Sequence, residues 1–338
     1  MLDRSTLRLL EWRCDDPCET VYADVPQPIE IVNWGKAMST GISTENVVET
    51  PWMRAPNLHG DSLGSIHDED EAKRIGFRAA PIGANTLLAF YTPVLVDLFG
   101  QAWHERGFLS LDFLSTIDEG NSFRILASQA PGLPEDERVV TLVMEKEDGR
   151  TANMGYAGVT VAHVTAVPPW QRPDALPLAG PEADSDVLPR RALGSGFSRT
   201  ICVRPEHTAA ARKVAADSLA WYQTASPWGG AIVPMNTYHN LGFPHFELEP
   251  TRKPSITTSR RADPSRAGMN ARLQLVLTGP MICGEPYSYR QVLIEKGFSK
   301  RTAFSTVEYV IESDVGETVA VGRQKVRWFV PKGQADRV

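Results

Sequence analysis

The sequence predicts an α+β fold in which an antiparallel sheet wraps around a central apolar helix, with this unit present twice. Three observations lead to this prediction. Residues 82–99 are apolar around almost the whole circumference of a helix, which is typical of a buried helix. From Leu109 onward, apolar residues recur at every second position, the period of a strand. Both patterns then return roughly 150 residues later, a period that indicates an internal repeat.

The apolar helix has clear limits in the sequence. Pro81 suits the first turn of a helix, and Gly100 suits the position just after its end. A short acidic helix is expected before it, over residues 69–75, because Gly76 follows as a stop signal. The loop ahead of this short helix is polar and carries carboxylates and imidazoles.

Strands are expected after the helix, since the spacing of apolar residues changes to two. They are predicted at 109–113, 122–127, 138–145 and 151–164, with a hairpin at Asp148-Gly149-Arg150. A helix followed by several antiparallel strands is the order expected of α+β packing.

The repeat begins after a proline-rich linker at 166–191. A strand at 199–203 and a helix at 207–216 are predicted first. Residues 228–237 then echo 78–86, with Asn-Thr at the same place in both, and strands follow around Leu273–Leu277, at 305–312 and at 318–329. The predicted domains are an N-terminal half at 1–165 with the candidate catalytic loop, a linker at 166–195, and a C-terminal half at 196–338.

Composition excludes several classes of function. The chain has 338 residues, 42% of them hydrophobic, with 41 acidic and 35 basic residues and a net charge of −6. This balance disfavours nucleic acid and anionic membranes as partners. No signal peptide or membrane-spanning stretch is apparent, and the four cysteines lack zinc spacing, so a cytoplasmic protein with reduced thiols is expected. No phosphate-binding loop is present, and we expect neither a cofactor nor a metal.

The polar loop carries a resemblance to a known family. The run Ile66-His67-Asp68, followed by a short helix and then by Gly83 at the start of the apolar helix, resembles the MaoC-like hydratase/dehydratase family. Its loop has the form G-D-x-N-P-[IL]-H-x-[DN]. The resemblance covers most of 45–165 and 196–330, and it implies a double hotdog fold with an activity of the (R)-specific enoyl-CoA hydratase type.

The loop departs from the family at one position. The family has Asp five residues before the His, where this chain has Ser62, and the nearest carboxylate is Asp61. In the family the Asp and the His hold a water that adds to the β-carbon of an α,β-unsaturated thioester. The resemblance therefore implies His67 and Asp61 as catalytic residues, with Gly83 leaving room for the thioester carbonyl at the helix N-terminus. The alternatives are a capping role for His67 and a turn role for Asp61.

Substrate-binding residues are expected in both halves. In the first half these are Ser62, which could orient a water, and Ala84 beside Gly83. The second half has Asp217 and Tyr222 where the family would show Asp-x4-His. Phenol titrates near pH 10 and is a weak base at neutral pH, so we expect this half to be catalytically silent. Asp217 and Tyr222 would then contact substrate in the cleft, or else lie on a surface helix.

Other functions remain open on the sequence alone. A hotdog thioesterase is disfavoured, because no carboxylate lies between residues 82 and 96. A non-catalytic acyl-binding scaffold, or an enzyme acting on a polyketide-type intermediate with His67 as acid/base, would explain the altered loop. His59, Asp61 and His67 could also form a metal triad. The partner implied by the resemblance is an acyl thioester on coenzyme A or a carrier protein, and two halves in one chain permit a monomer or a homodimer.

Overall fold

The structure is a computed structural model that describes residues 47–60, 65–74, 76–129, 138–159, 193–194, 196–208, 220–224, 226–242, 246, 268–299 and 302–329. All of them belong to one compact unit, Ile42–Val338. The other unit, Met1–Gly41, and the predicted linker at 166–191 lie outside the described residues.

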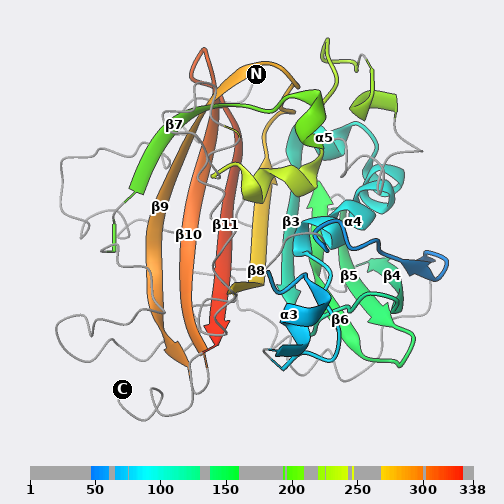
Figure 1. Cartoon of the computed structure of the whole chain (residues 1–338). Helices are drawn as coiled ribbons and strands as arrows, with labels where there is room; N and C mark the ends of the chain where they lie inside the picture. Colours follow the sequence, from blue (N-terminus) through cyan, green and yellow to red (C-terminus); the bar gives the residue numbers. More distant parts are fainter. Residues whose placement is uncertain are drawn as a thin grey trace, which may run out of the picture. The chain divides into compact units, whose positions relative to one another are not determined.

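One large antiparallel sheet of 11 strands dominates this unit (Figure 1). Its strands are β1 (Val48–Glu49), β2 (Met53–Arg54), β3 (Gly107–Phe113), β4 (Ser122–Gln129), β5 (Arg138–Lys146), β6 (Thr151–Val159), β7 (Gly196–Cys202), β8 (Gly268–Leu277), β9 (Pro286–Ser299), β10 (Thr302–Ser313) and β11 (Thr318–Phe329). The order across the sheet is β1-β4-β5-β6-β3-β8-β11-β10-β9-β7, and β2 also pairs with β4. The predicted antiparallel strands are confirmed.

The strand order has an internal symmetry about the pair β3–β8. On one side the order away from this pair is β6, β5, β4, and on the other it is β11, β10, β9. β3 precedes β4 to β6 in the chain and pairs with the last of them, β6. Likewise, β8 precedes β9 to β11 and pairs with the last of them, β11. The two series therefore have the same connectivity.

The central pair has one apolar face and one face that carries polar side chains together with Phe108 and Val276. Leu109 and Leu111 of β3 are buried, as are Leu273 and Leu275 of β8. On the alternate positions, Arg272 of β8 makes a two-pronged ion pair with Asp112 of β3 at 2.6 and 2.9 Å. The apolar face of this seam continues into the main hydrophobic core.

The long helix α4 (Ala84–Phe99) confirms the predicted apolar helix. Gly83 precedes it in an extended conformation, and Gly100 ends it with φ 62°, a left-handed value that glycine adopts easily. Nine of its residues are buried, and six of them join the core that contains the inner faces of β3 to β6. Phe90 meets Phe123 of β4 edge-on, with ring centroids 5.0 Å apart. Two short helices flank it, α3 (Glu69–Arg74) and α5 (Ala102–Arg106).

The segment that leads into α4 has a counterpart in the second half. Each is held to the loop before a strand by one backbone bridge and one hydrogen bond. In the first half, Pro81 forms the bridge to Asp118, and Ile82 N donates to Ile117 O at 2.8 Å. In the second half, Ile232 forms the bridge to Ile282, and Val233 N donates to Met281 O at 2.8 Å. The residues that follow have nearly the same dihedrals, φ −61° and ψ 141° at Gly83 and φ −63° and ψ 140° at Pro234.

The helix after Pro234 differs from the long helix that the repeat predicts. It is a 3-10 helix, η4 (Met235–Asn240), six residues long, preceded by the shorter η3 (Ala220–Tyr222). Gly242 follows, and a Cβ there would lie 2.9 Å from Gln291 Oε1 and 3.1 Å from Tyr289 Oη. The chain thus approaches β9 closely just after η4. The helix predicted at 207–216 is described only as far as Thr208.

The described residues contain no helix long and apolar enough to cross a membrane.

Candidate functional site

His67 lies between the polar loop and α3, and a backbone carbonyl fixes its ring. Its Nδ1 is 2.6 Å from Pro81 O, which can only accept, so Nδ1 carries the proton and Nε2 has a free lone pair. Burial lowers the pKa of His67, the bond to Pro81 opposes this, and the nearby His59 lowers it further. The ring is therefore neutral at pH 7, and its Nε2 can accept a proton.

Two further contacts set the backbone around His67. Asp68 caps the next helix, because its Oδ1 accepts from Glu71 N at 2.8 Å. Asn57 donates from Nδ2 to His67 O at 2.8 Å and accepts from His59 N at Oδ1 at 3.2 Å. One carboxamide thus ties together the backbones of both histidines.

Gly83, at the N-terminus of α4, lies against both imidazoles. A Cβ on Gly83 would meet His67 Cε1 at 3.6 Å, His59 Cδ2 at 3.1 Å and Asn85 Oδ1 at 2.7 Å, the last too short for a real side chain. No described residue accepts from the N–H groups of Ala84 and Asn85. These donors belong to the positive end of the helix and can hold a developing negative charge.

A cavity of about 130 Å³ opens beside His67. Its lining residues come from the loop and α4, from the end of β3 and the turn after it, from β6, and from the start of β8: Ile66, His67, Pro81, Ile82, Ala84, Leu87, Phe113, Leu114, Ser115, Thr116, Ile117, Asn153, Gly268, Met269 and Asn270. Both halves of the sheet thus contribute to one mostly apolar cavity. Leu114 in its wall is 55% exposed, which marks the side open to solvent.

The structure brings together three of the predicted site residues. His67 and Ala84 line the cavity, and Gly83 lies next to His67. Asp61, Ser62 and Asp217 lie outside the described residues.

Tyr222 is placed elsewhere. It is buried and does not line this cavity, and its ring meets that of His104 with centroids 5.8 Å apart. Burial raises the pKa of Tyr222 well above 10, so the phenol stays protonated.

Sequence reasoning missed the contact of His59 with Asn85, whose Oδ1 lies 3.3 Å from His59 Nε2. The sequence suggested His59 only as a metal ligand, and the described residues contain no cluster of three or more side chains suited to a metal. Its Nε2 instead lies 3.1 Å from Nδ2 of Asn85, in the first turn of α4. The available signal was the Asn-Thr pair at 85–86, which recurs at 236–237.

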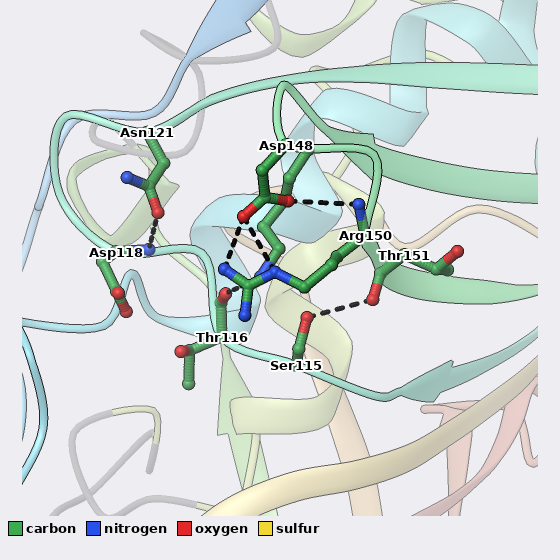
Figure 2. A network of polar contacts seen from close by, with 8 residues as sticks. Ser115, Thr116, Asp118, Asn121, Asp148, Arg150 and Thr151 are labelled. Carbon is green, nitrogen blue, oxygen red and sulfur yellow. Dashed lines mark hydrogen bonds and ion pairs between the residues drawn. The ribbon is translucent and has the colours of Figure 1, made fainter.

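A second, polar cavity of about 610 Å³ lies behind the first. It is lined by Arg78, Ala79, Asp118, Glu119, Gly120, Asn121, Ser122, Lys146, Glu147, Asp148 and Arg150. Figure 2 shows the ion pair of Asp148 with Arg150 and the bond from the Asp118 N–H to Asn121, which fix the loops around it. Buried Lys146 donates to Thr116 O at 3.2 Å. In the segment 116–119, Thr116 and Ile117 thus line the first cavity, and Asp118 and Glu119 line the second. The hydrogen bond from Lys146, which lines the polar cavity, fixes this segment.

Comparisons with known proteins identify the fold. No family model and no curated protein matches the sequence. Among solved structures, a MaoC domain dehydratase from Chloroflexus aurantiacus J-10-fl is similar at 10% identity with a TM-score of 0.52, over 85% of this chain and 95% of that one. A Mycobacterium tuberculosis protein with a double hotdog fold is similar at 11% identity with a TM-score of 0.50, over 85% and 97%. The chain therefore has a fold like that of MaoC-like and hotdog proteins.

Proposed function

We propose that this hotdog-fold protein is a hydratase/dehydratase that adds water to, or removes it from, an α,β-unsaturated acyl thioester or a related intermediate. One observation carries the proposal. A neutral imidazole with a free Nε2 lies against the N-terminus of a buried helix, and His67 and the first helical residue, Ala84, line one cavity. This supplies a base and an anion-binding group within reach of one substrate.

The reaction needs only these groups and a water. In hydration, His67 Nε2 takes a proton from the water while its oxygen bonds to the β-carbon. The π electrons move onto the thioester oxygen, where the N–H groups of Ala84 and Asn85 stabilise the charge. The protonated His67 then returns its proton to the α-carbon. Dehydration is the same path reversed.

Asp61 is proposed as the second acid/base, on the strength of the sequence resemblance. Ser62, Ala84 and Asp217 are proposed to contact the substrate, whereas the buried Tyr222 lies away from the cavity. The matching strand orders on the two sides of β3–β8, and the matching bridges before α4 and η4, support the proposal that the architecture is a double hotdog. In it the N-terminal half carries the chemistry.

The substrate is proposed to be carried on coenzyme A or a carrier protein. A second candidate is an enzyme of the same type that acts on a polyketide-type intermediate. Two observations favour it: a cavity of only about 130 Å³, which is small for a long acyl chain, and Ser62 at the position of the family's carboxylate. A non-catalytic acyl-binding protein would need the same cavity but not the tautomer of His67.

The test is hydration of crotonyl-CoA, longer 2-enoyl-CoAs and branched 2-enoyl-CoAs, followed by loss of the enoyl absorbance. We expect turnover by the wild type and a loss of about 100-fold or more in His67→Gln, since general base catalysis contributes that much. His207→Gln is the matched control, because His207 does not line the cavity. Free-thiol release instead would indicate a thioesterase. Absence of all turnover, with binding of the same acyl-CoAs, would overturn the enzyme in favour of a binding protein.

A further inference from the structure

Asn153 is a polar residue on the buried face of the sheet. It lies in β6, where its Cα pairs with Phe113 of β3 and with Met144 of β5. Leu111, two residues before Phe113, lies on the same face of the sheet and belongs to the hydrophobic core. Asn153 itself is 0% exposed. Burying a carboxamide among apolar side chains is unfavourable unless its hydrogen bonds are made.

The hydrogen bonds of this carboxamide are largely unmade. Its Nδ2 donates to Met144 Sδ at 3.4 Å, and a thioether is only a weak acceptor. Among the described residues, Asn153 Oδ1 has no hydrogen-bond partner. An unsatisfied buried polar atom costs about 1–3 kcal/mol, so its presence in a core calls for an explanation.

The explanation lies in the cavity of about 130 Å³ beside the candidate base, because Asn153 is part of its lining. The other carboxamide in that lining, Asn270, is satisfied differently, since its Oδ1 accepts from Gln324 Nε2 at 2.6 Å. Ser115, also in the lining, donates its hydroxyl to Thr151 O at 3.0 Å. Asn153 is thus a buried side chain of the wall whose polar atom a bound molecule would satisfy.

The place of Asn153 along α4 indicates which part of a substrate it meets. Burial raises the pKa of Tyr91, and the Asn153 side chain lowers it by a smaller amount, so the two side chains are neighbours. Tyr91 follows Ala84 by about two turns of α4. Long side chains lean back toward the helix N-terminus, so the phenol lies on the order of 5 Å beyond the first N–H groups. A chain with its thioester at those N–H groups and its β-carbon at His67 therefore reaches Asn153 with carbons further along.

We propose that Asn153 is a specificity-determining residue that binds a hydroxyl group on the acyl chain, beyond the β-carbon to which water is added. This inference rests on the proposed hydration. A hydroxyl both donates and accepts, so it pairs with the carboxamide in either orientation of the amide, whereas a methyl group leaves the polar atom of Asn153 unsatisfied. The substrate class is then a hydroxylated 2-enoyl thioester, and a plain fatty acyl chain is the poorer substrate.

Substrates of matched size test this recognition. 5-Hydroxypent-2-enoyl-CoA and hex-2-enoyl-CoA differ by a terminal hydroxyl in place of a methyl group, and 6-hydroxyhex-2-enoyl-CoA with hept-2-enoyl-CoA extends the comparison by one carbon. In at least one pair, the wild type should hydrate the hydroxylated member with a kcat/KM about 10-fold or more higher, the usual effect of satisfying a buried polar group. Equal values in both pairs, or a preference for the apolar members, would overturn the proposal.

Two substitutions of Asn153 connect the preference to this side chain. Asn153→Leu replaces the amide by an apolar group, and Asn153→Ala removes it should the larger side chain prevent folding. Both should lose the preference for the hydroxylated substrate while hydration of the apolar one stays within several-fold of the wild type. Thr92→Val is the matched control, since Thr92 Oγ1 is also buried without a partner among the described residues but does not line the cavity. A wild-type ratio in the Asn153 variants, or an equal loss with both substrates, would overturn the proposal.

A second measurement does not depend on turnover. Titration calorimetry with the saturated analogues of each pair, such as 5-hydroxypentanoyl-CoA and hexanoyl-CoA, compares their affinities directly. The wild type should bind the hydroxylated analogue about 10-fold more tightly, and Asn153→Leu should bind the apolar one better. If the wild type hydrates no enoyl-CoA, the proposed reaction fails, and this measurement alone decides on Asn153. Equal affinities in the wild type would overturn the recognition role even in an active enzyme.

Discussion

Gly83→Ala tests whether the reaction needs close approach to the N-terminus of α4. The backbone at Gly83 has φ −61° and ψ 141°, which any residue adopts, so alanine introduces no backbone strain. Its methyl group would instead lie 2.7 Å from Asn85 Oδ1 and 3.1 Å from His59 Cδ2. The Asn85 amide must move, and His59 must shift by a few tenths of an ångström. The effect is therefore confined to the site.

The effects on stability and activity can be separated. Replacing glycine here restricts the unfolded chain and contributes about 0.4–1 kcal/mol, while overpacking costs about 1–3 kcal/mol. Unfolding should therefore become easier by at most about 2–3 kcal/mol. Activity depends on alignment, where displacement by about 1 Å can cost about 100-fold in rate. We thus expect kcat/KM to fall by about two orders of magnitude in a protein that remains folded.

The assay is hydration of the best enoyl-CoA together with thermal unfolding. Gly279→Ala is the matched control, since the nearest atom to a Cβ at Gly279 is Val319 Cγ1 at 3.9 Å. It should keep both activity and Tm close to the wild type. If Gly83→Ala retains kcat/KM within about threefold, the carbonyl does not approach this amide, and the proposed path is wrong.

Three further predictions follow from the structure. Because burial lowers the pKa of His67, and the neutral ring is the active form, activity should fall on the acidic side with a midpoint below pH 6.5; a midpoint above 6.5 in kcat/KM would contradict this. His59→Gln removes a charge that lowers the pKa of His67, so that pKa, followed by NMR, should rise relative to wild type, and an unchanged or lower value would show that the rings are uncoupled. Between β3 and β8, Asp112→Asn breaks the ion pair with Arg272, whose side chains are 36% and 31% exposed, and should lower the free energy of unfolding by under about 1 kcal/mol. Leu275→Ala, in the buried core, should lower it by about 2–5 kcal/mol. Denaturant unfolding measures both values, and a larger loss in Asp112→Asn would contradict the proposed role of the apolar face.

Local signals were sufficient to predict most elements. Pro81 and Gly100 delimit α4 to within a few residues, because both act through their own backbone preferences. The strands after it follow from alternation, since one face of the sheet is buried. The helix after Pro234 could not be predicted in the same way. It ends two residues before Gly242, where the chain approaches residues of β9 that are about 50 positions away.

The candidate site was only partly predictable for the same reason. His67 and Gly83 stand in a recognisable spacing, so sequence alone pointed to them. The partner of His59 is Asn85, 26 residues away, whose amide nitrogen and oxygen lie 3.1 and 3.3 Å from His59 Nε2. Likewise, the contribution of Gly268 and Met269 to the cavity depends on the pairing of β3 with β8. Contacts of this kind appear only when the chain is folded.

The two halves differ most at the residue that opens the helix. Gly83 lets the side chains of His59, His67 and Asn85 approach the start of α4 closely, whereas the position with nearly the same dihedrals in the second half is Pro234. Within η4, the hydroxyl oxygen of Tyr238 accepts a hydrogen bond from Met281 N at 3.2 Å. Like Tyr222, Tyr238 is buried, and burial raises the pKa of both phenols.

 The second half lines the cavity through Gly268, Met269 and Asn270 of β8. This supports the proposal that the second half shapes the cavity while the first half carries out the reaction.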